Sequence, residues 1–156
     1  MARKASPEIG EGAVIAIPLS DGRWALSQVY RPGISFFLLV FDQVSDRLED
    51  PLVLTGRPIL GSWTNDAEIY RGNWKVLTHR PVAPSIFVEP EYTFIIDGET
   101  MVESFDGTRR RAKAACGDEA LRTRSSQSPL LVQDAARAAF GIEAWKPVYD
   151  RMRLQP

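Results

Sequence analysis

The first 105 residues alternate between short apolar runs and turn residues, a pattern that is typical of β-strands joined by tight turns. The first three runs cover residues 13–19, 23–30 and 34–41. Asp21-Gly22 separates the first two, and Asp-Gly between apolar runs predicts a hairpin with a type I′ turn, in which both central residues have positive φ. The third run is apolar on both faces and should be a central strand. We therefore predict a three-stranded meander.

The middle of the chain predicts further strands and a second hairpin. We expect strands over residues 58–63 and 74–79, a short turn of helix over 65–72 and a loop or short helix over 42–51. Prolines make residues 81–90 an extended connection. Asp97-Gly98 lies between the apolar runs 92–96 and 99–105, which is again the signature of a hairpin. Asp106-Gly107 then leads into a strand over 108–113.

The C-terminal part predicts helices. Ser128-Pro129 is a favourable helix start, because serine caps an unpaired N–H and proline suits the first helical position. Gly141 is the expected stop. The expected inner side of this helix is Leu131, Ala135, Ala138, Ala139 and Ile142, and a last short helix from Trp145 or Pro147 to Met152 should follow.

These elements predict an α+β fold. We expect a mainly antiparallel, strongly twisted β-sheet or small barrel with C-terminal helices. The chain should form a single domain over 1–156, with a β-rich body from about 8 to 113 and a helical part from about 114 to 156.

The composition is that of an ordinary soluble globular protein. The 156 residues carry 19 basic and 20 acidic side chains, so no overall positive field favours nucleic acid or an anionic membrane. One Cys and one His exclude an intrachain disulfide and a zinc site built mainly from these residues. The N-terminus lacks the apolar stretch of a secretory signal, and no run approaches the 20 or so residues of a membrane span. We expect a cytoplasmic protein without metal or cofactor.

No motif for catalysis occurs in the sequence. His79 follows a predicted strand and could act as a base with Cys116 or a serine, but an isolated imidazole at a strand end is the favoured interpretation. Aromatic side chains on strands could stack bases or hold a ligand, yet tryptophans more often fill the core of a β-domain. The sequence therefore predicts a protein that is not an enzyme.

The placement of charge is more informative than its sum. Residues 1–105 contain 9 basic and 14 acidic side chains, whereas residues 106–156 contain 10 basic and 6 acidic ones. Residues 81–106 carry six acids and no base, and residues 109–113 carry four bases. Such asymmetry can steer a charged partner onto one face. The alternative, that the basic strand pairs internally with its acidic neighbour, is at least as favoured.

Three segments resemble the immunity protein 26 family of bacterial polymorphic toxin systems. Residues 11–29 are similar to the start of that family, in which a strand ending in Ile-Pro-Leu leads into Asp-Gly, an aromatic residue and a second strand. Residues 69–77, with Gly72-Asn73-Trp74, resemble its second block, and the connection over 81–90 is also similar. Ala13 stands where the family has an acid. The resemblance covers roughly residues 8–106, and its motifs are turn and core positions.

The resemblance implies a small intracellular protein that binds a toxin and blocks it by covering its surface. Such inhibition needs about 800 Å² per partner with complementary charge, and no catalytic group. The alternative is a small-molecule or nucleic-acid binding β-barrel module. Our candidate toxin-contact residues are acids of residues 81–106 and, second, of residues 42–50: Glu89, Glu91, Asp97, Glu99, Glu103, Asp46, Glu49 and Asp50.

Overall fold

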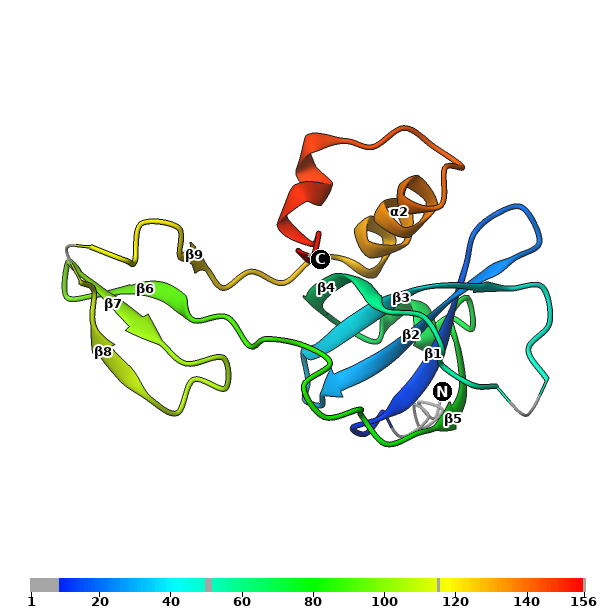
Figure 1. The fold of residues 1–156 in the computed structure, drawn as a ribbon, viewed down its shortest axis with the longest axis horizontal. Coiled ribbons are helices and arrows are strands. Elements are labelled where there is room, and N and C mark those ends of the chain that lie inside the picture. The colour runs from blue at the N-terminus through cyan, green and yellow to red at the C-terminus, as the bar shows by residue number, and fades with distance from the viewer. Residues whose placement is uncertain (1–8, 50–51, 115, 156) are drawn as a thin grey trace, which may run out of the picture. The chain divides into compact units, whose positions relative to one another are not determined.

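The computed structural model describes residues 9–49, 52–114 and 116–155. The chain forms two compact units, which we describe separately (Figure 1). Unit 1 contains the described residues up to Ile86 and those from Ser126, and unit 2 is Phe87–Ser125. The fold is α+β with mostly antiparallel sheets and short helices, as the sequence predicted. No helix within the described ranges has the length and apolar character needed to cross a bilayer.

Unit 1 contains a five-stranded sheet in the order β4-β3-β2-β1-β5. Its strands are β1 Ala13–Pro18, β2 Trp24–Arg31, β3 Phe36–Ser45, β4 Pro58–Thr64 and β5 Lys75–His79. All neighbours in this sheet are antiparallel. The predicted β1-β2-β3 meander is confirmed, and β3 lies between β2 and β4. The sheet ends at β4 and β5, so the small closed barrel that we considered does not form.

The first hairpin differs from the prediction in its turn. Pro18 pairs with Trp24 and the Leu19 N–H donates to the Arg23 carbonyl, which leaves three residues in the loop. Positive φ occurs at Ser20 and Gly22 rather than at both Asp21 and Gly22. The Asp21 carboxylate instead accepts hydrogen bonds from the backbone and the side chain of Arg23. These local bonds favour a longer loop than the predicted type I′ turn.

Strand β3 begins and ends later than predicted. Ile34 is fully exposed and precedes the strand, whereas the polar residues from Asp42 to Ser45 continue it. They do so because β2 extends back to Trp24, and Trp24 and Ala25 pair with Ser45 and Val44. The prediction of a loop or short helix from Asp42 was therefore wrong for these four residues, since the ladder outweighed their polarity. Its last two residues lie outside the described ranges.

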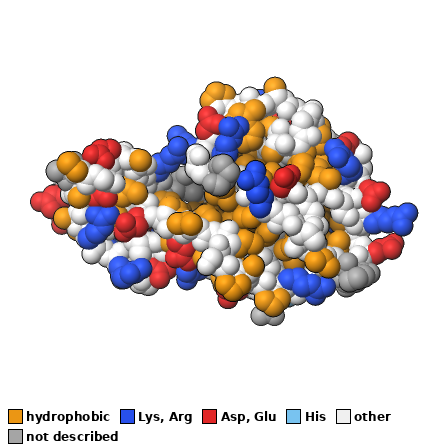
Figure 2. Space-filling view, viewed as in Figure 1, with side chains coloured by type: hydrophobic (Ala, Val, Ile, Leu, Met, Phe, Trp, Pro, Cys, Tyr) orange, Lys and Arg blue, Asp and Glu red, His pale blue; other side chains and the backbone are white. Residues whose placement is uncertain are grey.

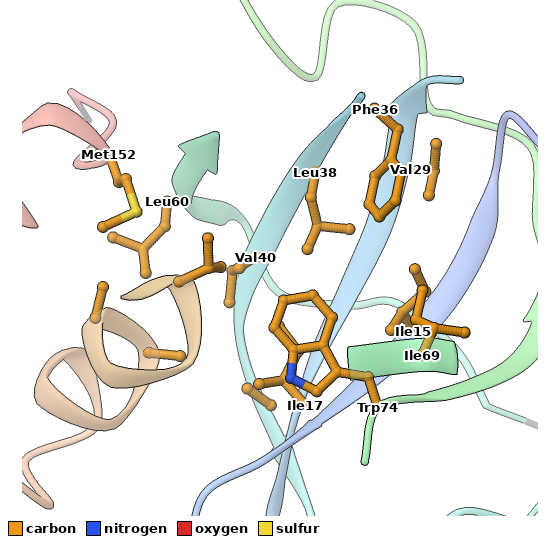
Figure 3. Close-up of a cluster of buried hydrophobic side chains, with 14 of the residues drawn as sticks. Ile15, Ile17, Val29, Phe36, Leu38, Val40, Leu60, Ile69, Trp74 and Met152 are labelled. Carbon is orange, nitrogen blue, oxygen red and sulfur yellow. The ribbon is translucent and has the colours of Figure 1, made fainter. Parts of the chain in front are cut away.

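The core of unit 1 lies where one face of the sheet meets the helices. Side chains from alternate positions of β1, β2 and β3 point to this face, with Leu60 of β4 (Figure 3). Trp74 is the largest of the fully buried side chains, and its indole N–H donates to Gln133 Oε1 at 2.8 Å. The opposite face is also buried at Val14, Leu26 and Leu39. Both faces of the sheet therefore contribute apolar burial.

The helices of unit 1 complete this core. They are α1 Ala67–Tyr70, α2 Pro129–Ala139 and the 3-10 helix η1 Pro147–Arg151. Ser128 Oγ accepts from the Leu131 N–H, which confirms the predicted cap. The buried face of α2 includes Val132, Ala135 and Ala136, whereas Ala139 is exposed, which corrects that part of the predicted inner side. The buried face of α2 therefore differs from the predicted one: it includes Val132 and Ala136, which are four residues apart and share one side of the helix.

The outer edge of β4 is covered by the C-terminal segments of the chain. The Gly61 N–H donates to the Met152 carbonyl and the Leu154 N–H to that of Ile59, while the Gln127 N–H donates to the Trp63 carbonyl. An uncovered strand edge is a template for unwanted pairing with another chain. The tail therefore protects this edge of the unit 1 sheet.

Glu68 fixes the connection between α1 and β5. Its buried carboxylate accepts hydrogen bonds of 2.6 Å from both Asn73 and Arg71. The hydrogen bond from Asn73, together with Arg71, holds the pKa of Glu68 below its usual range. Because the N–H groups of Asn73 and Trp74 also donate to the Glu68 carbonyl, this residue positions Trp74 at the start of β5.

Unit 2 contains a smaller sheet in the order β8-β7-β6-β9. Its strands are β6 Tyr92–Ile96, β7 Glu99–Glu103, β8 Arg110–Ala112 and β9 Arg122–Thr123. The predicted second hairpin is confirmed, with Ile96 paired to Glu99 and positive φ at both Asp97 and Gly98, as a type I′ turn requires. The short β9, parallel to β6, was not predicted. Two residues are too few to leave a periodic signal.

Candidate functional site

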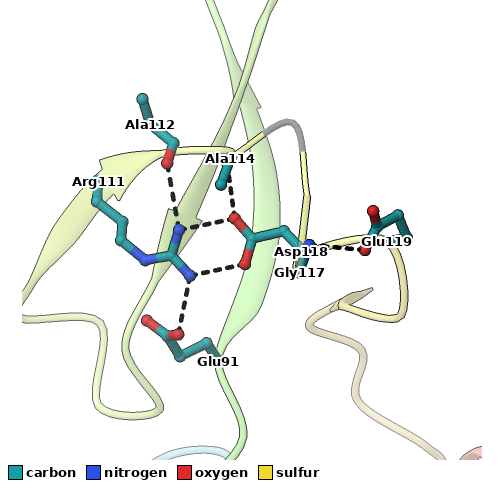
Figure 4. A network of polar contacts seen from close by, with 7 residues as sticks. All are labelled: Glu91, Arg111, Ala112, Ala114, Gly117, Asp118 and Glu119. Atoms are coloured by element: carbon teal, nitrogen blue, oxygen red, sulfur yellow. Dashed lines mark hydrogen bonds and ion pairs between the residues drawn. The ribbon is translucent and has the colours of Figure 1, made fainter.

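Arg111 organises the ionic contacts of unit 2 (Figure 4). Its guanidinium makes two hydrogen bonds to Asp118, of 2.7 and 2.8 Å, and a third of 3.0 Å to Glu91. The Ala114 N–H donates to the same Asp118 carboxylate at 2.7 Å. The Arg111 bonds, followed by that from Ala114, lower the pKa of Asp118 to about 2. This network joins the loop after β8 to the segment before β6.

A second arginine binds Glu103 at the C-terminal end of β7. Arg124 Nε donates to Glu103 at 3.2 Å, and its Nη2 donates to the Phe105 carbonyl at 2.6 Å. Its guanidinium also lies over the Tyr92 ring, 4.7 Å from the centroid. Tyr92 in turn stacks on Phe105. The cation therefore lies against a pair of buried aromatic rings.

These contacts bear on the charge asymmetry of the sequence. Glu91 and Glu103, two of the candidate toxin-contact residues, are used in internal ion pairs with Arg111 and Arg124. The alternative left open by the sequence, pairing between the basic strand and its acidic neighbour, is therefore what the structure shows for Glu91, whereas Glu103 pairs with an arginine outside that strand. They hold unit 2 together, so a partner would have to compete for them.

Asp97 and Glu99 are placed differently, at the tip of the β6–β7 hairpin. Both are exposed, and neither carboxylate has a hydrogen bond or ion pair within the residues that the structure describes. Beside them, Ile95 and Ile96 expose 75% and 46% of their surface. We refer to Ile95, Ile96, Asp97 and Glu99 as the hairpin tip. It combines exposed apolar area with unpaired negative charge.

Unit 2 also contains a groove of about 400 Å³. It is lined by residues 89–91, 104–105 and 109–111, so Glu89 lies in its wall beside three arginines. Arg110 is partly engaged, since its guanidinium lies 5.0 Å from the Phe94 ring centroid. Arg109 has no side-chain partner among the described residues. The groove therefore presents both signs of charge over the buried Phe105.

The acids of the second predicted region lie in unit 1. Asp46 and Glu49 are exposed in the connection between β3 and β4, and no side-chain partner is found for them in the described part of the chain. Asp50 lies outside the described residues. The seven candidate residues that the structure describes are thus divided between internal pairs, the hairpin tip, the groove and this connection. The structure does not gather them into one acidic cluster on either unit.

The residues considered for catalysis show no active-site arrangement within their own units. His79 is exposed at the end of β5, where it pairs with Ala13 in the ladder. Cys116 is a free, exposed thiol in unit 2. Across the described ranges, no three His, Cys, Asp or Glu side chains are grouped as a metal ion would require. The four tryptophans all belong to unit 1, where Trp63 and Trp74 are buried.

Sequence reasoning missed the two isoleucines and the role of Asp118. A signal for the isoleucines was present: Ile95 and Ile96 are adjacent on a strand, so they point to opposite faces of a sheet whose turn follows immediately. Burying both isoleucines would require further elements of the chain on both faces of the hairpin, next to its turn. Asp118 lies in a segment without periodicity, and its pairing with Arg111 depends on tertiary structure alone. Figure 2, viewed as Figure 1, shows acidic, basic and hydrophobic side chains intermixed over the strands of unit 2.

Comparison with known proteins yields no match to any family model, curated protein or solved structure. The positions that carry the immunity-protein resemblance have structural roles here. Gly12 has φ +82°, and a Cβ there would lie 2.2 Å from the Arg80 carbonyl oxygen, so only glycine fits. Trp74 is a core residue and Gly72 ends the α1 turn with positive φ. The motif positions thus account for the fold of unit 1 and identify no binding residue.

Proposed function

We propose that this protein is an immunity protein that binds a bacterial toxin and blocks it by covering its surface, without catalysis, in the cytoplasm of the cell that makes the toxin. The support from the sequence is the resemblance over residues 8–106. The support from the structure is unit 2, which has little core of its own and leaves apolar side chains exposed.

The exposed apolar surface of unit 2 is the observation that carries the proposal. Its buried apolar side chains in the described residues are Tyr92, Val102 and Phe105, whereas Val88, Ile95 and Ile96 are exposed. A unit of about 40 residues rarely has a sufficient core without disulfides, metals or association with another chain. Association with a protein partner would bury the remaining apolar surface.

Co-expression tests this proposal. The genes beside the gene for this chain are searched for a toxin domain, which is then expressed in a sensitive host with and without the chain, and cell survival is measured. We expect survival only when the chain is present, and a complex of the purified chain with an inactive toxin variant on size-exclusion chromatography. Toxicity that is unchanged by the chain, or the absence of any complex, would contradict an immunity function.

The groove of unit 2 supports a second candidate function, the binding of a small anionic molecule or a nucleic acid. Arg109 is unpaired among the described residues and lies beside Arg110 and Phe105 in the groove lining. This candidate predicts that a single-stranded oligonucleotide or inorganic phosphate binds at low salt and is released as salt is added. Substitution Arg109→Gln should then weaken binding. Unchanged affinity in that variant would remove the second candidate.

A further inference from the structure

We propose that the hairpin tip inserts into a cleft of the toxin that has apolar walls and a rim of lysine and arginine side chains. This inference rests on the proposed function and names the contact that carries it. Among the described residues of unit 2, the hairpin tip brings exposed apolar area and unpaired charge together, whereas Glu91 and Glu103 are already paired with Arg111 and Arg124.

The geometry of the hairpin favours insertion over flat docking. Ile95 pairs with Thr100 and Ile96 pairs with Glu99, and adjacent residues of a strand point to opposite faces. A flat partner surface could contact one of the two isoleucines. A cleft that closes around the tip contacts both, and this is the arrangement that buries the apolar area on both faces.

The hairpin is also rigid enough to enter a cleft without a large entropic cost. All five residues of β6 pair with β7, and the type I′ turn at Asp97-Gly98 fixes the register. Arg124 and the stacked rings of Tyr92 and Phe105 hold the other end of the hairpin. A preorganised element loses less conformational freedom on binding than a flexible loop.

The charges at the tip identify the chemistry of the partner. Asp97 and Glu99 lie within four residues of Ile95 in the sequence and have no side-chain partner among the described residues. Carboxylates that enter a complex unpaired lose their hydration, so a partner that binds tightly must offer cations at the border of the cleft. Opposite charge at this position would also accelerate encounter between the two proteins.

Two pairs of variants test the inference, with the inactive toxin domain encoded by the adjacent gene as the probe. Ile95→Thr together with Ile96→Thr keeps β-branched side chains on the strand but removes apolar area, and Ile34→Thr is the control at a fully exposed isoleucine of unit 1. We expect the double variant to weaken binding by about 30-fold or more, as for interface hot spots, and the control to bind like the wild type.

The second pair concerns charge. Asp97→Asn together with Glu99→Gln removes both charges without changing shape, and Glu11→Gln is the control at an exposed acid of unit 1 that is not among the candidate contact residues. We expect the double variant to weaken binding by about tenfold at low salt, mainly through slower association, and this difference to shrink as salt screens the charges. The control should retain the affinity and salt dependence of the wild type.

The outcomes distinguish this inference from the proposed function. If the chain protects cells but both double variants bind within threefold of the wild type, the hairpin tip is not the contact and the immunity function stands. If the wild type neither binds nor protects, the immunity function itself is overturned. A wild-type dimer in sedimentation velocity that dissociates in the Ile95→Thr/Ile96→Thr variant would identify a second copy as the occupant, which also overturns the inference. Amide NMR chemical shifts of unit 2 that are unchanged away from the substituted residues establish that the variants fold.

Discussion

Unit 1 and unit 2 are both built around antiparallel hairpins, but different interactions hold them together. Unit 1 buries apolar side chains on both faces of a five-stranded sheet and closes one face with helices. Unit 2 relies on Arg111 and Arg124, which bind carboxylates and backbone carbonyls around a few buried rings. Apolar burial is non-directional and tolerates changes of pH and salt, whereas the ionic contacts depend on both. The comparison therefore predicts that unit 1 is robust and that unit 2 is more easily perturbed by changes of pH and salt.

The largest expected effect is from a change in the small core of unit 2. Phe105 is 2% exposed and packs against Tyr92 and Phe87, so Phe105→Ala should remove about 3–5 kcal/mol, which is as much as a core this small supplies. We expect residues 87–125 to lose their amide hydrogen-exchange protection. Tryptophan fluorescence, which reports on unit 1 alone, should keep its denaturation midpoint. A shifted fluorescence midpoint would show that the two units unfold together.

The matched substitution in unit 1 should remove a smaller fraction of the total stability of that unit. Leu38 is 1% exposed in the centre of the sheet, and Leu38→Ala should cost about 2–5 kcal/mol because it leaves a cavity. We expect a lower midpoint in denaturant by tryptophan fluorescence, with unit 1 still folded in buffer. If Leu38→Ala unfolded unit 1 completely, the contrast between a robust and a marginal unit would fail.

The smallest expected effect concerns pH. The pKa of Asp118 is lowered to about 2 in the folded protein, against about 3.9 for an ordinary aspartate, so folding favours its charged form. The contribution of Asp118 to the free energy of unfolding is present above about pH 4 and is lost as the pH falls from about 4 towards 2. Amide protection in unit 2 should decline over this window.

The control for this prediction is Asp118→Asn, which should weaken protection in unit 2 already at neutral pH and reduce its further dependence on acid. Unit 1 contains its own acid-sensitive carboxylate, Glu68, whose pKa is also lowered. The measurement must therefore follow amides of unit 2 separately from tryptophan fluorescence. Equal acid dependence of unit 2 in the wild type and the Asp118→Asn variant would contradict the assignment to Asp118.

Local sequence patterns predicted most of the elements in their order, β9 excepted, because apolar periodicity and turn residues act over a few positions. The Asp97-Gly98 turn, the Ser128 cap and the β1-β2-β3 meander followed from residues within a few positions of each other. The loop at Asp21 and the extent of β3 did not, since a side-chain hydrogen bond and the ladder with β2 decided them.

Which acids pair internally and which remain unpaired depends on the tertiary structure. The sequence ranked the acids of residues 81–106 before those of residues 42–50 but did not separate the acids within each region. In the structure Glu91 and Glu103 meet arginines 20 and 21 positions away, and Asp97 and Glu99 meet none in the described residues. Ion pairing depends on distance in space, which a charge pattern along the chain does not record. Exposure of Ile95 and Ile96 was likewise decided by what the fold leaves beside the end of a hairpin.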